Sequence, residues 1–127
     1  MANPSKAKGT RAETRVVRYL KCFGIFAERK ALAGSSDQGD LRIITSDGEE
    51  ITAEVKTGKQ THNYSRTDFK TWKEQTIIEG LSSRCPSVLI IVRYRRCITD
   101  AEVWLPNKTG VGWTMMYLDE FVYEIGR

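Results

Sequence analysis

Asp40, Glu54 and Lys56 are the residues of this chain whose types and spacing suit catalysis. Thirteen residues separate Asp40 from Glu54, and only Val55 lies between Glu54 and Lys56. Two carboxylates that converge can bind a hard divalent cation such as Mg²⁺ or Mn²⁺, and the backbone carbonyl of Val55 could supply a further oxygen ligand. Such an ion activates water for attack on a phosphodiester. Lys56 could orient that water or stabilise the charge that develops on the phosphorus centre.

These side chains meet only if the chain between them forms a β-hairpin, which the sequence predicts. Two runs rich in β-branched residues, 41–45 and 51–55, flank the turn signal Ser46-Asp47-Gly48. With Gly48 in the left-handed position of a three-residue loop, Asp40 lies opposite Glu54. Side chains alternate across a strand. One face then carries the core residues Leu41, Ile43, Ile51, Ala53 and Val55. The other face carries Asp40, Arg42, Glu50, Thr52, Glu54 and Lys56.

Length and composition predict one domain spanning residues 1–127 and exclude several classes of protein. A chain of 127 residues can bury a real core but is too short for two domains. No apolar run approaches the ~20 residues of a membrane span, and the basic N-terminus lacks a secretory signal. The three cysteines lack a CxxC spacing, so we expect reduced thiols in a cytoplasmic protein.

Positive charge is concentrated in the first part of the chain. Residues 1–30 hold eight basic and two acidic side chains, a net +6, so the remaining residues of this +4 chain sum to −2. A basic segment beside a carboxylate site suits phosphate neutralisation together with metal binding, although a solvated helix face is the alternative. Lys6 and Arg15 of this segment are therefore candidates for DNA contact, and Lys59, in the polar stretch after Lys56, is a further candidate. Arg93, Arg95 and Arg96 form a second basic cluster near a strand end.

The N-terminal segment predicts a flexible basic arm followed by an amphipathic helix. The arm is expected over residues 1–8, and Thr10 with Glu13 has capping-box spacing. The helix should end near Phe23, before Gly24. Its apolar stripe is formed by Ala12, Val16, Leu20 and Phe23.

Glu13 falls inside this apolar stripe, where a carboxylate is costly unless it is paired or coordinated. Three explanations are open: the capping box, a salt bridge to Arg42 or Lys56, or a role as metal ligand or orienting group.

The remaining elements predict an α/β fold. We expect a strand over 24–29, a loop of small residues over 33–39, the hairpin, and a helix that has Thr67 or Asp68 as its N-cap and runs to Gly80. The apolar run 88–92 predicts a central strand, followed by a strand over 101–105 that Pro106 ends and a helix over 118–125. The order α-β-β-β-α-β-β predicts a central mixed sheet flanked by helices, with 106–127 as a C-terminal extension.

Several motifs together resemble a known family. They are Lys8-Gly9-Thr10-Arg11-Ala12-Glu13, then Arg29, Gly34-Ser35-Ser36, Gly39-Asp40 and Glu54-Val55-Lys56. Over about residues 6–105 this set is similar to the archaeal-type (Hjc-like) Holliday junction resolvases of the PD-(D/E)xK nuclease superfamily, small relatives of which occur in bacteriophages. The resemblance implies a restriction-endonuclease-like core and a homodimer that cleaves four-way DNA junctions with Mg²⁺. For a phage-encoded protein the location would be the host cytoplasm.

The resemblance also implies roles for individual residues. Glu13 matches the family's N-terminal helix glutamate, Asp40 and Glu54 its metal carboxylates, and Lys56 its catalytic lysine. Gly39 stands where many members have Pro. DNA contact is implied for Lys8, Arg11, Arg29 and for Ser35 or Ser36.

The resulting expectation is a metal-dependent, structure-specific DNA endonuclease that resolves Holliday junctions by paired symmetric nicks. Two alternatives stay open. One is a nuclease of the same superfamily acting on flaps, single strands or duplex DNA, and the other is a DNA-binding protein without catalysis.

Overall fold

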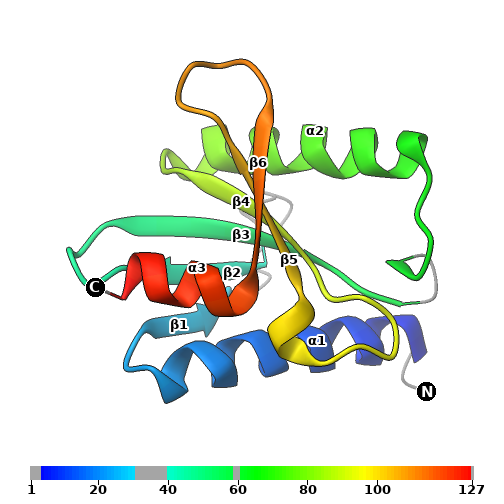
Figure 1. Ribbon diagram of the computed structural model, residues 1–127, viewed down its shortest axis with the longest axis horizontal. Helices are drawn as coiled ribbons and strands as arrows, with labels where there is room; N and C mark the ends of the chain where they lie inside the picture. The colour runs from blue at the N-terminus through cyan, green and yellow to red at the C-terminus, as the bar shows by residue number, and fades with distance from the viewer. Residues whose placement is uncertain (1–3, 31–39, 59–60, 127) are drawn as a thin grey trace.

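The computed structural model describes residues 4–30, 40–58 and 61–126. Within these ranges the chain forms three α-helices, one 3₁₀ turn and six strands (Figure 1). The helices are α1 (Pro4–Cys22), α2 (Arg66–Ser83) and α3 (Leu118–Ile125), and the 3₁₀ turn is η2 (Ile98–Asp100). The strands are β1 (Phe26–Arg29), β2 (Leu41–Ile44), β3 (Glu50–Lys56), β4 (Ser87–Ile91), β5 (Glu102–Pro106) and β6 (Trp113–Tyr117).

The six strands form one mixed sheet in which they lie in chain order, β1-β2-β3-β4-β5-β6. β3 and β4 pair parallel, with α2 as the crossover between them, and the other neighbouring strands pair antiparallel. α2 covers one face of the sheet, and α1 and α3 cover the other (Figure 1). The predicted α/β architecture, a central mixed sheet flanked by helices, is confirmed.

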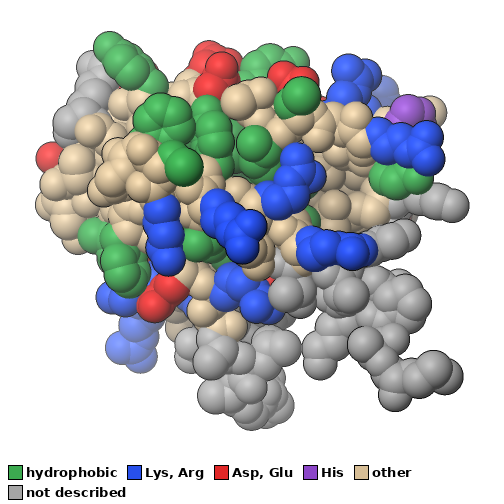
Figure 2. Space-filling view, turned by 90° about the horizontal axis from the view of Figure 1, so that it is seen from below, with side chains coloured by type: hydrophobic (Ala, Val, Ile, Leu, Met, Phe, Trp, Pro, Cys, Tyr) green, Lys and Arg blue, Asp and Glu red, His purple; other side chains and the backbone are tan. Residues whose placement is uncertain are grey.

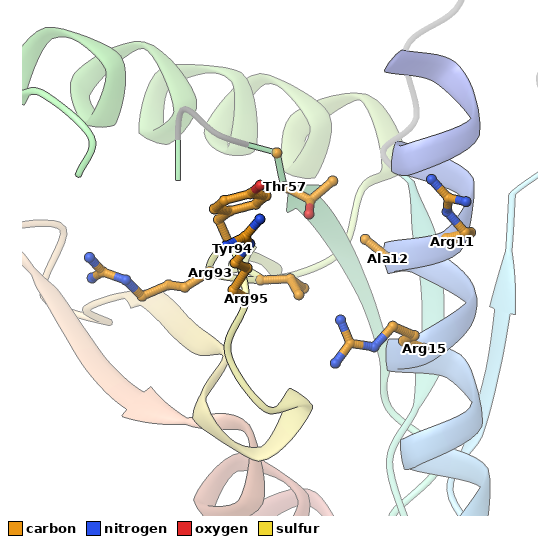
Figure 3. A pocket seen from close by; sticks show the side chains of 9 residues that line it. Arg11, Ala12, Arg15, Thr57, Arg93, Tyr94 and Arg95 are labelled. Carbon is orange, nitrogen blue, oxygen red and sulfur yellow. The ribbon is translucent and has the colours of Figure 1, made fainter. Parts of the chain in front are cut away.

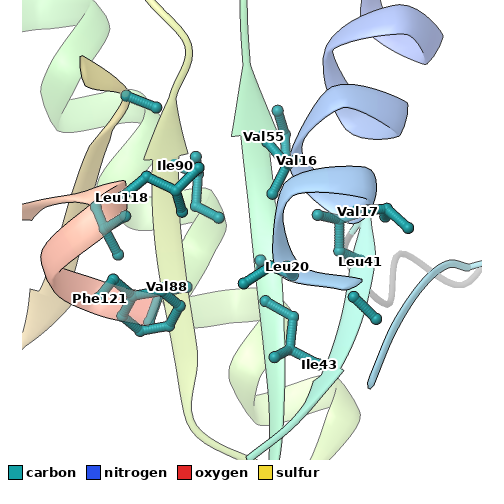
Figure 4. Packing of buried hydrophobic residues seen from close by; sticks show 14 of the residues in the cluster. Val16, Val17, Leu20, Leu41, Ile43, Val55, Val88, Ile90, Leu118 and Phe121 are labelled. Atoms are coloured by element: carbon teal, nitrogen blue, oxygen red, sulfur yellow. The ribbon is translucent and has the colours of Figure 1, made fainter. Parts of the chain in front are cut away.

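The main core lies between the sheet and the pair α1 and α3 (Figure 4). Val16 and Leu20 of α1 pack there with Leu41 and Ile43 of β2, as the predicted apolar stripe and hairpin face require. Phe23, expected in the same stripe, is instead 57% exposed. It lies beyond the end of α1 and contacts the ring of Tyr19 edge-on, with the ring centroids 5.1 Å apart.

A smaller core lies on the opposite face, under α2. Trp72 of α2 packs against Leu89 and Ile91 of β4, and Phe69 borders this cluster. All five residues of β4 are buried, which confirms the prediction of a central strand. The N-cap of α2 is Ser65, whose hydroxyl accepts a hydrogen bond from the Asp68 N–H at 3.0 Å, and not Thr67 or Asp68 as expected.

The N-terminal prediction was wrong in two respects. α1 begins at Pro4, so residues 4–8, expected within a flexible arm, are helical. Proline suits the first helical position because its φ is already helical and its missing N–H needs no partner. Thr10 therefore lies inside the helix, and the capping-box explanation of Glu13 is excluded.

The segment beyond Pro106 belongs to the fold instead of extending from it. The helix predicted over 118–125 is confirmed, but strand β6 was not predicted. Leu118 and Phe121 are almost completely buried in the main core. The Leu118 N–H donates to the Ala101 carbonyl at 2.8 Å, which ties the start of α3 to the start of β5. Residues 106–126 thus complete both the sheet and one helical layer.

Candidate active site

The β2–β3 hairpin has the register that the sequence predicted. Ile44 pairs with Glu50 and Arg42 with Thr52, and Leu41 faces Ala53. Continuing this register places Asp40 opposite Glu54.

The turn explains why the register holds. Gly48 adopts a φ of +83°, a conformation that costs free energy for residues with a Cβ atom but not for glycine. Its N–H donates to the Thr45 carbonyl at 2.9 Å, and the Thr45 N–H donates to the Glu49 carbonyl at 2.9 Å. The loop therefore closes on Thr45 and Glu49, and the parity of the two strands follows from it.

Only one end of the polar hairpin face forms a candidate catalytic site. At the turn end, Arg42 is held in ion pairs with Glu50 at 2.7 Å and with Glu28 at 3.3 Å. Thr52, in the middle, is buried and accepts a hydrogen bond from Lys30 at 2.6 Å. The other end of the face carries the predicted catalytic residues.

Asp40 is half-buried and lies next to a second carboxylate. Its Oδ2 accepts a hydrogen bond from the Val55 N–H at 2.8 Å. Burial, followed by the negative charge of Glu54, raises the pKa of Asp40 to about 7; Glu13 adds to the rise, and the Val55 N–H and Lys56 oppose it. Removing water and placing like charges together both disfavour the ionised form. A cation between Asp40 and Glu54 would relieve both effects.

Glu54 and Lys56 form an ion pair at this corner. Lys56 Nζ lies 2.9 Å from Glu54 Oε1, and their side chains are 22% and 8% exposed. Glu54 Oε2 is buried without a hydrogen-bond partner among the described residues. A buried carboxylate oxygen without a donor is costly, so this atom is available as a ligand.

Glu13 reaches the same corner from α1. Its Oε1 accepts a hydrogen bond from Arg29 Nε at 2.9 Å, so the partner is Arg29 and not Arg42 or Lys56 as expected. The influence of Glu13 on the Asp40 pKa shows that its charge acts on the site. The structure therefore brings Glu13, Asp40, Glu54 and Lys56 together where α1 passes the ends of β2 and β3.

The residues present suit a divalent cation bound mainly by two carboxylates. No group of three or more His, Cys, Asp or Glu side chains converges as a metal site in the part of the chain that the structure describes. Asp40 and Glu54 alone would leave positions for water and substrate, which is how Mg²⁺ is commonly held. The Val55 N–H points to Asp40, and the N–H and C=O of one strand residue share a side, so the Val55 carbonyl faces the same way.

The predicted DNA-contacting residues divide into three groups. Arg11 and Arg15 of α1 line a pocket of about 250 Å³ beside the end of β3 (Figure 3). Arg29 pairs with Glu13. Ser35, Ser36 and Lys59 lie outside the described residues, as do the side chains of Lys6 and Lys8 within α1.

The same pocket is also lined by residues that the sequence analysis did not assign to the site. Thr57, Arg93, Tyr94 and Arg95 line it opposite α1 (Figure 3). Arg93 and Arg95 were noticed as a charge cluster, but no local pattern shows that they face a helix some eighty residues earlier in the chain. The Arg15 side chain, which donates to the Arg96 carbonyl at 3.5 Å, establishes that proximity.

The chain has an α/β fold: a six-stranded mixed sheet has one helix on one face and two helices on the other, and the β2–β3 hairpin within the sheet carries the two carboxylates. Among solved structures it is similar to Archaeoglobus fulgidus Hjc, a Holliday junction resolvase from an archaeal hyperthermophile. The TM-score is 0.54 with 21% sequence identity, and the match covers 93% of each chain. This likeness shows the fold.

No protein-family model matches the chain, and no curated protein matches its sequence. In the described part of the chain, none of the helices combines the length and apolar character needed to cross a bilayer.

Proposed function

We propose that this chain is a metal-dependent DNA endonuclease that resolves four-way junctions by paired symmetric nicks. The observation that carries the proposal is the Asp40–Glu54 pair. Its Asp40 carboxyl has a strongly raised pKa, and Glu54 has a buried oxygen that finds no hydrogen-bond partner in the part of the chain that the structure describes. A pair of this kind beside a lysine is unfavourable until a cation binds. The fold shared with a Holliday junction resolvase supports the same activity.

Asp40, Glu54 and the Val55 carbonyl would hold Mg²⁺, or Mn²⁺ in its place. When bound, such an ion supplies Lewis-acid activation of water and of the phosphodiester. Asp40 would release its proton as the ion binds, since metal ligation requires the ionised carboxylate. Lys56, held by Glu54 at 2.9 Å but still partly exposed, would orient the attacking water and offset charge on the phosphoryl oxygens. Glu13 would position Arg29 and add negative charge near Asp40.

Recognition would depend on the phosphate backbone and on DNA shape. Arg11 and Arg15 lie beside the site on one helix, which suits phosphate contact. Figure 2 shows Lys and Arg side chains gathered over this face of the molecule. A surface of this kind binds four-way junctions through their geometry more than through their sequence.

Paired nicks require two active sites related by a two-fold axis, so we propose a homodimer. The outer face of α2 supports this proposal. Ile77, Ile78 and Leu81 are exposed there, and Ile77 and Ile78 border a groove of about 540 Å³ that Trp113 of β6 also lines. Such an apolar patch is typical of an interface. If two α2 helices met antiparallel with Ile77 against the partner's Leu81, Glu74 would face the partner's Arg84, because both pairs are symmetric about residue 79.

The test is cleavage of end-labelled DNA in Mg²⁺, comparing a four-way junction with linear duplex, flap and single strand. We expect symmetric paired nicks confined to the junction. Cutting of flaps or single strands instead would keep the site chemistry and reject the junction as substrate. Absence of cutting in both Mg²⁺ and Mn²⁺ would favour DNA binding without catalysis.

Two variants connect the activity to the site. Asp40→Ala and Glu54→Gln are expected to abolish cleavage while junction binding in EDTA stays close to that of the wild type. Glu50→Gln is the matched control, because Glu50 lies on the same face of β3 but pairs with Arg42 away from the site. Equal loss of binding and cleavage in Glu54→Gln would reject its assignment as a metal ligand.

A further inference from the structure

The segment that follows β4 faces the middle of α1 across the arginine-lined pocket. Arg11 and Arg15 lie on the helix side, and Arg93, Tyr94 and Arg95 lie on the other side (Figure 3). Thr57 and Gly58 also line the pocket, and they follow Lys56 directly in the chain. The pocket therefore begins beside the catalytic corner and leads away from it.

The arginines of this pocket differ in what they contact. Both terminal nitrogens of the Arg93 guanidinium are hydrogen-bonded within the protein: Nη1 donates to Glu102 Oε2 and Nη2 to the His62 carbonyl, both at 2.7 Å. Arg95 is exposed, and its guanidinium lies 5.1 Å from the ring centre of Tyr94. Neither Arg11 nor Arg95 forms an ion pair with a carboxylate within the described ranges. Arg93 thus shapes the segment, while Arg11 and Arg95 present positive charge to a ligand.

The backbone of this segment is held in a strained conformation. Arg95 has a φ of +59°, in the left-handed region that favours glycine. The turn is fixed on both sides of Arg95. The Arg96 N–H donates to the Arg93 carbonyl at 3.2 Å, and the Tyr94 N–H donates to the hydroxyl of buried Thr61 at 3.0 Å. A residue at positive φ costs free energy and persists where the surrounding structure holds it, as these hydrogen bonds hold the turn at Arg95.

A second hollow borders the same turn. It has a volume of about 420 Å³ and is lined by His62, Tyr94, Arg95 and Arg96. The rings of His62 and Tyr94 meet edge-on there, with centroids 6.4 Å apart. Residues 94–96, here called the Tyr94–Arg96 ridge, therefore border two basic hollows. Aromatic rings next to cations suit the sugar, phosphate and base of a nucleic-acid strand.

We propose that the Tyr94–Arg96 ridge and α1 together form a backbone-binding groove for the DNA strand that is cut. A phosphate adjacent to the scissile one would bind between Arg11, Arg15 and Arg95, and the strand would then cross the ridge toward His62. This inference rests on the proposed nuclease function and extends it to a second segment of the chain. It assigns Arg95 as a binding residue and Arg93 as a positioning residue.

The experiment is the salt dependence of junction binding by Arg95→Gly in EDTA. Glycine removes the charge and favours the backbone conformation of residue 95, so the variant should unfold at the same temperature as the wild type or higher. Loss of one phosphate contact should lower the slope of log K against log salt by roughly 0.7–0.9 and weaken binding roughly fivefold to tenfold at 100 mM salt. Arg95→Lys should retain the slope.

The control is Lys108→Gly, which removes one exposed positive charge at the hairpin between β5 and β6, far from α1 in Figure 1. It should leave the slope unchanged.

The possible failures are distinguishable. A wild-type slope in Arg95→Gly, in a protein that cleaves junctions, would reject the groove and leave the nuclease proposal intact. A lowered slope in a protein that never cleaves would support DNA-backbone binding at the ridge but reject the nuclease proposal. A wild-type protein that does not bind DNA in EDTA would reject the groove outright.

Discussion

Asp40→Asn should stabilise the metal-free protein at neutral and basic pH. The structure raises the Asp40 pKa from 3.8 to about 7, chiefly through burial and then through the charge of Glu54. The folded state therefore holds a proton that the unfolded state has already released once the pH exceeds 3.8. Stability is lost as pH rises from 3.8 to about 7 and is constant above that value.

The magnitude follows from the size of the shift. A displacement from 3.8 to about 7 corresponds to about 4 kcal/mol of unfolding free energy at pH 8, as an upper bound. About 3 kcal/mol of this is lost between pH 5 and pH 8. Asparagine has no charge to bury, and its side-chain oxygen can still accept the Val55 N–H. The advantage of Asp40→Asn over the wild type should therefore grow by up to about 3 kcal/mol between these pH values.

The assay is urea unfolding in EDTA at pH 5 and pH 8, with the two proteins compared at each pH so that other titrating groups cancel. Asp47→Asn, on the exposed turn of the same hairpin, controls for the loss of one negative charge. Adding Mg²⁺ at pH 8 should stabilise the wild type and leave Asp40→Asn unchanged, since only a protein that binds the ion gains from it. An Asp40→Asn advantage that is the same at pH 5 and pH 8 would refute the reasoning about the carboxylate pair.

Three further substitutions test other parts of the structure. Glu13→Gln should lower the free energy of unfolding by less than about 1 kcal/mol, because its ion-pair partner Arg29 is partly exposed. It should nevertheless slow cleavage about tenfold or more, and a wild-type rate in a cleavage assay would exclude a role for Glu13 in the site. Phe121→Ala should lower the free energy of unfolding, measured in urea, by about 3–5 kcal/mol, because Phe121 is buried in the main core. Tyr123→Ala, on the exposed side of α3, is the control and should lower it far less. Equal losses in the two variants would contradict the central role of Phe121. Leu81→Glu should give a monomer in sedimentation equilibrium without loss of thermal stability, and an unchanged dimer would exclude the outer face of α2 as the interface.

The hairpin could be predicted because its signals are local. Gly48 fixes the turn, and the alternation of apolar and polar residues fixes which side chains share a face. Once the register is known, the meeting of Asp40 with Glu54 follows without any information from the rest of the chain. The central position of β4 could be predicted equally well, since the run Val88 to Val92 is apolar on both faces.

The features that were missed depend on distant contacts or lack a pattern. Strand β6 has no buried residue in the run Trp113 to Tyr117, so nothing in its periodicity marks it as part of a sheet. The start of α1, up to Lys8, is mostly polar and basic and has no apolar stripe, so its sequence predicted a flexible arm instead of a helix. The pairing of Glu13 with Arg29 and the approach of Arg95 to α1 are set by tertiary packing, which no local propensity encodes.

The order of the strands has a consequence for how the protein folds. Strands that neighbour each other in the sheet also neighbour each other along the chain, and β3 with β4 is the parallel pair that must wait for α2. Closing a short hairpin costs little chain entropy, whereas closing the β3–α2–β4 unit costs more, so we expect the latter to limit the folding rate. The hairpin that holds Asp40 and Glu54 would then form before β4 pairs with β3 and completes the sheet. Mutations in α2 should slow folding more than mutations in the hairpin turn, even where both destabilise the native state equally.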